Sequence, residues 1–306
     1  MSSFFGFNTE SGEIAFAAYH QDEVVCYIPQ YGGWYETRHN VKQGLDELAV
    51  ARDCVLENMV RVVGEGARMV LKPGEYHPRV WRGVYRRAII GGCDQLNPLR
   101  VYGQTYMRSI VAAESLFSEV KEVFKVVEPE LVNFNCFGHR FRELLMLLCS
   151  EVEACWTGIL KANEMEVRAK ARFTTKNYVM LCSPLKLAEW QVRLKDYRGL
   201  TFQPFKTWDS IKPTSSLSWY DDYNKVKHDR EGNFSLGTLG NVLQAAAALH
   251  IMQSVQFGPG VFDMMLGNRF SIFDSLDGPT FDLSEIYISD PVENGDFHTE
   301  IKLNIE

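Results

Sequence analysis

The first hundred residues show strand-like and then helix-like hydrophobic patterns. Residues 11–36 carry weakly alternating β-branched and aromatic side chains, which predict one or two small hairpins. Between residues 44 and 63 the apolar side chains recur at helical spacing, so a helix is predicted there. Glycine and proline become frequent over 64–104, which indicates an irregular connection. We therefore expect a boundary between two parts of the chain near residue 100.

Two long amphipathic helices are predicted in the middle of the chain. The first ends at Pro129, because proline disfavours helical backbone in the residue before it. The second is predicted over 138–164, where an apolar stripe suits packing in a helical bundle. The stripe consists of Phe141, Leu145, Leu148, Val152, Cys155 and Ile159. Arg140 and Glu151 project along its border, and Glu153 points further out.

The pattern changes again in the last third of the chain. Near-alternating apolar residues over 178–212, interrupted by Pro184 and Pro204, predict a β-ribbon inserted between helices. A short helix follows, with aromatic residues at its start and Gly232 just after its end. The next apolar, alanine-rich stretch ends at Gly258-Pro259 and predicts a helix at the centre of the core.

Together these elements predict a mainly α fold built around a helical bundle. The bundle is expected over residues 101–260 and contains the β-ribbon as an insertion. A mixed α/β segment, residues 1–100, precedes it, and a short β-rich tail, residues 261–306, follows it. These three ranges are the domain organisation that we expect.

Composition and charge narrow the classes of function. With 306 residues, of which 46% are hydrophobic, the chain can bury a substantial core. A formal net charge of -7 argues against attraction of the whole surface to nucleic acid or anionic lipid, so nucleic-acid binding requires a local cationic patch. The seven cysteines form an odd set without a Cys-x-x-Cys pair, which is typical of buried thiols in a reducing compartment.

Targeting signals and membrane spans are not predicted. The N-terminus has no positively charged start followed by an apolar stretch, so we expect no signal peptide. Apolar runs such as 242–252 are too short to cross a bilayer. These features predict a soluble, cytoplasmic protein with no membrane partner.

Candidate chemistry lies in the short helix, within the sequence YNKVKHDR. Residues four apart share a helix face, so Asn224 and His228 project together, with Tyr223 and Lys227 on the neighbouring ridge. An imidazole that titrates near neutral pH, beside an amide and cations that hold a phosphate, makes up the parts of a metal-free ribonuclease site. Alternatively, Asn224 and His228 make hydrogen bonds within the bundle and the cations form a solvated face. No set of residues has metal-ligand spacing, so we expect neither a metal nor a cofactor.

A second cationic cluster lies before residue 90. Its members are four arginines and two aromatic residues: Arg79, Trp81, Arg82, Tyr85, Arg86 and Arg87. Aromatic rings beside arginines can receive single-stranded RNA. The favoured interpretation is that the rings pack inward and the arginines are solvated.

Three stretches of the chain resemble the HEPN superfamily of bacterial α-helical bundle proteins. They read GHRFRELLMLLCSEVEACW, PFKTW and WYDDYNKVKHDR, and the similarity covers about residues 105–257. The hallmark of that superfamily is an Arg, a polar residue, three further residues and a His, on a helix that faces an acidic helix. Asn224 matches the polar residue, His228 matches the His, and Tyr223 occupies the position of the Arg. The resemblance implies a HEPN-like bundle, a homodimer or partner subunit, and RNA as the target.

The resemblance also implies roles for individual residues. In such proteins, sites from two protomers cleave RNA without a metal and leave a cyclic phosphate. In the expected catalytic set, His228 acts as acid and base, Asn224 and Lys227 bind the phosphate, and Glu151 orients the His. The residues expected to contact the substrate are Tyr223, Arg230 and Arg140. One hypothesis is therefore a metal-independent endoribonuclease acting in stress or antiphage defence. The other is a non-catalytic scaffold or sensor subunit that uses the same helix to dimerise or to bind a nucleotide or partner.

Overall fold

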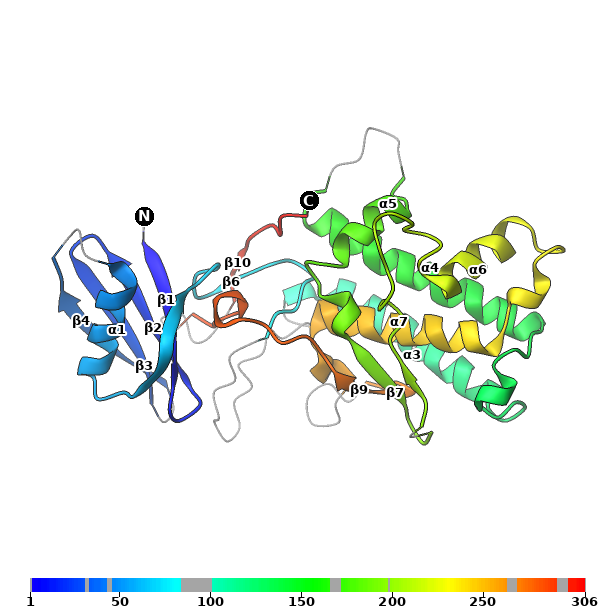
Figure 1. Cartoon of the computed structure of the whole chain (residues 1–306), viewed down its shortest axis with the longest axis horizontal. Helices are drawn as coiled ribbons and strands as arrows, with labels where there is room; N and C mark the ends of the chain where they lie inside the picture. Colours follow the sequence, from blue (N-terminus) through cyan, green and yellow to red (C-terminus); the bar gives the residue numbers. More distant parts are fainter. Residues whose placement is uncertain are drawn as a thin grey trace. The chain divides into compact units, whose positions relative to one another are not determined.

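The computed structural model describes residues 2–30, 33–42, 46–83, 101–165, 172–197, 199–262, 269–290 and 297–305 (Figure 1). Contacts between residues divide the chain into two compact units. Unit 1 comprises Met1–Tyr76, Arg82–Asn97 and Thr280–Ile301. Unit 2 comprises His77–Trp81, Pro98–Pro279 and Lys302–Glu306.

Unit 1 contains a five-stranded antiparallel sheet with the strand order β4-β3-β2-β1-β5. The strands are β1 (Ser3–Thr9), β2 (Ile14–His20), β3 (Glu23–Gln30), β4 (Gly33–Asn40) and β5 (Val62–Arg68). The predicted hairpins are thus confirmed, and the sheet extends beyond them. Helix α1 (Glu47–Glu57) buries Ala51, Cys54 and Val55 in a core shared with the sheet residues Phe5 and Phe7.

The helix predicted over 44–63 is shorter in the structure. It begins after Asp46, whose side chain accepts a hydrogen bond from the Leu48 N–H and so satisfies a free donor of the first turn. It ends at Glu57, and the chain enters β5 five residues later. Val63 therefore belongs to a strand, although its spacing also fits the helical pattern.

A second hydrophobic cluster of unit 1 joins both ends of the chain. Ile14, Phe16 and Met69 pack with Ile288 from the C-terminal part. Strand β6 (Glu75–Tyr76) pairs in parallel with β10 (Thr299–Glu300), and a 3₁₀ turn, η6 (Leu283–Glu285), contributes Leu283 to the cluster. The C-terminal segment thus completes the fold of the N-terminal unit.

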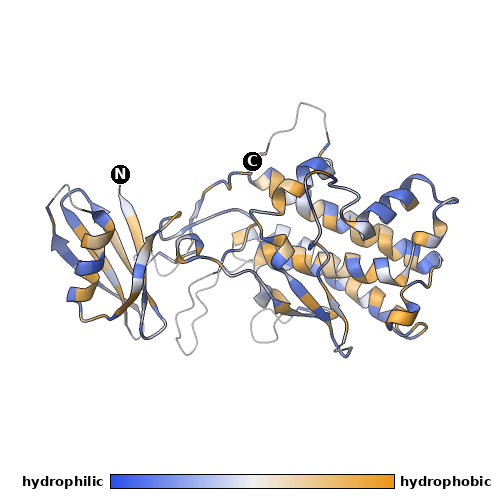
Figure 2. Cartoon of the chain, in the orientation of Figure 1, coloured by the Kyte–Doolittle hydropathy of each residue, from blue (hydrophilic) through white to orange (hydrophobic). Residues whose placement is uncertain are grey.

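Unit 2 is a helical bundle arranged around one apolar helix. Its helices are α3 (Gln104–Val123), α4 (His139–Ala162), α5 (Thr175–Tyr178), α6 (Ser218–His228) and α7 (Leu239–Phe257). Helices α3, α4 and α6 all contact α7, which is buried along most of its length and is largely hydrophobic in Figure 2. The helices predicted up to Pro129, over 138–164 and up to Gly258-Pro259 are therefore confirmed, with the first ending six residues earlier than the proline.

A three-stranded sheet with the order β8-β7-β9 packs into the same core. Its strands are β7 (Gln191–Leu194), β8 (Thr201–Phe202) and β9 (Phe273–Asp277). The β-ribbon predicted over 178–212 is confirmed only for β7 and β8. The residues before β7 form α5 and the 3₁₀ turns η2 (Val179–Leu181) and η3 (Leu187–Glu189) instead. Further 3₁₀ turns are η1 (Leu131–Asn133), η4 (Phe234–Leu236) and η5 (Pro259–Phe262).

The fold class predicted from the sequence is wrong: the chain is mixed α/β and not mainly a helical bundle. The five-stranded sheet of unit 1 is the reason. Strand β2 is buried at every position except its last, so its apolar residues do not alternate with polar ones. A strand buried on both faces gives little of the alternating signal that identifies strands, and the extent of the sheet was underestimated.

Candidate functional site

Helix α6 carries the YNKVKHDR sequence and is anchored by its aromatic face. Trp219, Tyr220, Tyr223 and Val226 are buried, with a spacing that places them on one side of the helix. On the outer side, the Lys225 ammonium lies 2.8 Å from Asp221 and 3.2 Å from Asp222. These aspartates neutralise Lys225, so the predicted solvated face is confirmed for this residue.

A polar network joins α6 to Glu153 of α4. The Tyr220 hydroxyl donates a hydrogen bond of 2.8 Å to the Glu153 carboxylate. The Lys227 ammonium lies 3.7 Å from the same carboxylate and donates a hydrogen bond of 3.0 Å to the Tyr223 hydroxyl. Burial, and secondarily the negative charge of Glu153, raises the pKa of both Tyr220 and Tyr223, so both phenols stay protonated at neutral pH.

A pocket of about 520 Å³ opens beside this network, between α4, α5 and α6. Three cationic side chains line it: Lys161 of α4, Arg172 before α5, and Lys227 of α6. Hydroxyl groups line it too, and the Thr157 and Tyr178 hydroxyls lie 3.1 Å apart at its wall. Within the part of the chain that the structure describes, neither Lys161 nor Arg172 forms an ion pair, which leaves their charges available to a ligand.

The residues predicted from α6 separate into three groups. Asn224 and Lys227 line the pocket, and the Asn224 amide donates a hydrogen bond of 2.9 Å to the Tyr220 carbonyl. Tyr223 is buried beneath them. His228 and Arg230 are exposed, His228 as the last residue of the helix, and neither belongs to the lining of the pocket. Within a single chain, the side chains of Tyr223, Asn224 and His228, which match the HEPN hallmark, therefore do not form one site.

The predicted residues of α4 lie elsewhere. Successive residues turn a helix by about 100°, so Glu151 lies about 200° away from Glu153 around α4. Burial raises the pKa of Glu151, whose charge acts on Cys155. Arg140 pairs with Glu119 and, at 3.5 Å, with Glu143. It precedes Glu153 by 13 residues, which corresponds to about 20 Å along the helix, and the structure does not bring it to the pocket.

The carboxylate that faces α6 is therefore Glu153. The sequence analysis placed Glu153 further from the apolar stripe than Glu151 and selected Glu151 instead. A signal for Glu153 exists in the sequence, because Glu153, Thr157 and Lys161 are spaced four residues apart. That spacing makes a polar stripe along α4, and all three residues line the pocket.

The cationic cluster before residue 90 is described only in part, since Tyr85, Arg86 and Arg87 lie outside the described residues. Arg79 belongs to unit 2, and its guanidinium donates a hydrogen bond of 2.8 Å to Gln256. Arg82 belongs to unit 1, where it is buried beside the Phe281 ring. Both described arginines are thus engaged by their own units.

The described residues present no arrangement suited to a metal ion or to a membrane span. In those ranges no group of three or more His, Cys, Asp or Glu side chains is placed to hold a metal ion. No helix there has the length and the apolar composition needed to cross a membrane.

Comparison of the chain with models of protein families, with curated proteins and with solved structures finds no match.

Proposed function

We propose that unit 2 binds a phosphate-bearing ligand, an RNA or a nucleotide, in the pocket between α4, α5 and α6. The observation that carries the proposal is the convergence of Lys161, Arg172 and Lys227 on one concave surface. Among the described residues of its lining, the one carboxylate is Glu153, which is engaged by the Tyr220 hydroxyl and by Lys227. The remaining positive charge and the surrounding hydroxyl groups match the charge and the hydrogen-bond acceptors of a phosphate.

Two features favour binding without cleavage. The phenol of Tyr223 stands where the HEPN hallmark has an arginine, and it is buried and uncharged at neutral pH. His228 lies outside the pocket lining, whereas an acid or base must reach the reacting atoms to within hydrogen-bond distance. We therefore favour a sensor or scaffold subunit of HEPN type over a nuclease.

Binding of labelled single-stranded RNA and of a labelled nucleotide, measured by fluorescence anisotropy at several salt concentrations, tests the proposal. Lys161→Gln and Arg172→Gln should each weaken binding of one or both ligands by about tenfold. For RNA, the slope of the logarithm of the binding constant against the logarithm of the salt concentration should become shallower by about 0.7 for each phosphate that the variant no longer neutralises. Lys72→Gln, which changes an exposed lysine of unit 1, is the matched control and should leave binding unchanged. Equal binding by all four proteins would refute the proposal.

A second candidate function is metal-independent RNA cleavage. Its support is that His228 is exposed and shares a helix face with Asn224, so a second subunit could complete a site there. Incubation of RNA with the protein and with His228→Ala in EDTA tests it. Cuts that bear 2′,3′-cyclic phosphate and disappear in the variant would establish the nuclease, whereas identical RNA profiles would exclude it for the isolated protein.

The proposed location is the cytoplasm, with a second copy or another subunit as partner. Cys26, Cys54, Cys149 and Cys155 are buried as free thiols. Burial raises the pKa of each of these thiols, which keeps them protonated and unreactive. Free thiols persist in a reducing compartment, which supports this location.

A further inference from the structure

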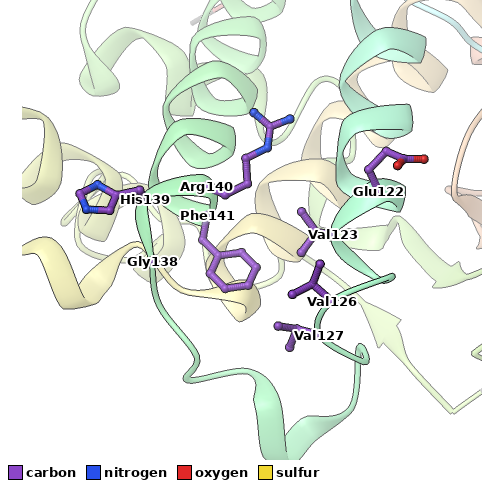
Figure 3. A pocket seen from close by; sticks show the side chains of 8 residues that line it. All are labelled: Glu122, Val123, Val126, Val127, Gly138, His139, Arg140 and Phe141. Atoms are coloured by element: carbon purple, nitrogen blue, oxygen red, sulfur yellow. The ribbon is translucent and has the colours of Figure 1, made fainter.

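In the described part of the chain, two surfaces are suited to bind a partner. One is an apolar groove in unit 2 between the ends of α3 and α4, where Phe141 faces Val123, Val126 and Val127 (Figure 3). Nothing in the structure shows what covers this groove. The other surface is the outer edge of β4 in unit 1, where the backbone and the charges together define the occupant.

Strand β4 lies at the end of the five-stranded sheet and, among the described residues, pairs only with β3 (Figure 1). The pairing is unbroken over eight residue pairs, from Glu23–Asn40 to Gln30–Gly33. A long edge strand presents unpaired N–H and C=O groups, and proteins usually protect such an edge with a bulge, a proline or a lysine. Strand β4 has none of these, so its outer edge remains able to pair with another strand.

The sequence determines which backbone groups point outward from this edge. Along an antiparallel pair of strands, residue pairs that exchange two hydrogen bonds alternate with pairs that exchange none. Pro29 has no N–H and lies opposite Trp34, so this pair is of the second kind. By alternation, Glu36 and Arg38 are also not bonded to β3. Their N–H and C=O groups are therefore directed outward.

A second copy of β4 matches this edge in its charges. Two copies related by a two-fold axis pair antiparallel, and the residues that exchange hydrogen bonds must come from the outward-facing set. Pairing centred on Thr37 places each Glu36 opposite the Arg38 of the other copy and the two Thr37 side chains opposite each other. Opposite charges and paired threonines both stabilise neighbouring strands.

The adjacent two-fold registers are unfavourable. Moving the axis by one residue toward the N-terminus places Glu36 opposite Glu36, and moving it by one residue toward the C-terminus places Arg38 opposite Arg38. Like charges directly opposite each other destabilise a pair of strands. The charges of β4 therefore select the register centred on Thr37.

The existing ion pairs of β4 are compatible with this register. The Arg38 guanidinium lies 2.8 Å from Glu36 of its own strand and 3.7 Å from Glu23 of β3, and its side chain is 62% exposed. A guanidinium has five N–H donors, so it can also bind a carboxylate of a second copy. The other ionisable residue of β4, His39, lies 3.0 Å from Glu57 of α1 and would face only a tyrosine, Tyr35, of the other copy.

We infer that two copies of the chain pair through the outer edges of their β4 strands, antiparallel about Thr37, and so join their two five-stranded sheets into one. Backbone hydrogen bonds hold the strands together, and two Glu36–Arg38 pairs fix their register. The inference does not depend on the phosphate pocket, because the pocket belongs to unit 2.

Sedimentation equilibrium of the full chain tests the inference. Arg38→Glu and Glu36→Arg each place like charges opposite each other twice, so each should weaken self-association by at least about tenfold. Mixed in equal amounts, the two variants should form a heterodimer, because every glutamate of one copy then faces an arginine of the other. Arg61→Glu is the matched control, since it makes the same change of charge at another exposed arginine of unit 1, and it should associate as wild type does.

Hydrogen exchange provides an independent readout, because the Glu36 and Arg38 amides should exchange more slowly as the concentration of the chain rises. A chain that stays monomeric at the highest concentration it tolerates would overturn the inference. Unchanged self-association of Arg38→Glu, or unchanged exchange of the two amides, would locate the interface elsewhere. Two variants that remain monomeric when mixed would show that residues 36 and 38 do not face each other. Both substituted side chains are exposed, so the variants should fold, and their melting curves check this.

Discussion

At the scale of single residues, Gly158 shows how a partly buried cation, Arg79, is accommodated in unit 2. A Cβ atom at position 158 would overlap the guanidinium of Arg79, which is held by its hydrogen bond to Gln256. Burial lowers the pKa of Arg79, but the group remains a cation at neutral pH because its ordinary value is so high. The C-terminal part of α4 therefore needs a glycine in spite of its low helix propensity.

We expect Gly158→Ala to destabilise the protein by about 1–3 kcal/mol, as overpacking of a core does. In an Arg79→Ala background the same change should be neutral, or should stabilise by up to about 1 kcal/mol, because only the gain in helix propensity remains. Urea denaturation of the wild type, both single variants and the double variant measures the coupling. The explanation fails if Gly158→Ala has the same effect in both backgrounds.

His250 is a buried neutral histidine that the sequence interpretation did not consider. Its two ring nitrogens lie 2.8 Å from the Ser271 hydroxyl and 3.1 Å from the Ser275 hydroxyl, and its ring stacks on Phe262. Burial, and secondarily the charge of Lys195, lowers the pKa of His250 to about 3. The folded chain thus binds this proton less readily than the unfolded chain does.

Because the folded-state pKa is the lower one, the contribution of His250 to stability is complete above about pH 6.5 and is lost as the pH falls toward 3. The loss should approach about 1.4 kcal/mol per pH unit within that window. We expect His250→Asn to show a shallower fall of the free energy of unfolding between pH 6.5 and 4 than wild type, whatever its stability at pH 7. Parallel pH profiles would contradict this assignment.

How far the sequence predicts the site can be judged from Glu151 and Glu153. Helical spacing placed Asn224 and Lys227 on α6 correctly, since they depend only on local geometry. The choice between the two glutamates depends on where α6 packs around α4, which the apolar period of α4 does not determine and only the polar spacing of Glu153, Thr157 and Lys161 indicates. Glu153 lies at the border of the α4 stripe that faces α6, and Glu151 lies on the other side.

At the scale of elements, α6 is attached to α4 through a charged hydrogen bond. The Tyr220 hydroxyl donates to the Glu153 carboxylate at 2.8 Å, whereas the comparable Tyr178 hydroxyl lies 3.1 Å from the neutral Thr157 hydroxyl. Both tyrosines are buried. Hydrogen bonds to a charged acceptor contribute more than neutral ones, and their loss leaves a carboxylate less well satisfied.

We expect Tyr220→Phe to lower the free energy of unfolding by about 1.5–3 kcal/mol and Tyr178→Phe by about 0.5–1.5 kcal/mol. Both changes keep the ring and remove only the hydroxyl, so each variant is the control for the other. Midpoints of urea unfolding measure the difference. An equal loss, or a larger loss in Tyr178→Phe, would show that the link to Glu153 does not hold α6.

Elements whose pattern is local were predicted best. Helices α3 and α4 have a clear apolar period, and α7 is a long, almost continuously apolar stretch. Helices α3 and α7 are also followed by a stop signal, Pro129 and Gly258. The 3₁₀ turns η2 and η3 lie in the segment that the sequence predicts as strand, because buried residues in short 3₁₀ turns do not keep the helical period. Strand β9 pairs with β7 across about eighty residues of sequence, and no local signal reports such a contact.

At the scale of the whole molecule, the chain passes between the two units several times, and after the long unit 2 segment Pro98–Pro279 it returns to unit 1 over Thr280–Ile301. The return is specific, because Ile301 donates a backbone hydrogen bond of 2.8 Å to Tyr76 and Ile288 joins the cluster on β2. Local sequence patterns predict domains as consecutive segments of the chain. The units observed here combine segments that are far apart in the sequence, and only long-range contacts show which segments belong together.

The stability of unit 1 should therefore depend on a residue near the C-terminus. Ile288 is 2% exposed and packs with Phe16 and Met69, so Ile288→Ala should cost about 2–4 kcal/mol through reduced burial and an unfilled cavity. We expect hydrogen exchange to accelerate in β1 and β2 and to stay unchanged in α4 and α7, whose core contains none of these residues. Ile211→Ala, at an exposed position, is the control and should change neither unit. Faster exchange throughout both units would show that they unfold as one cooperative body, and the separate cores would then not correspond to separate folding units.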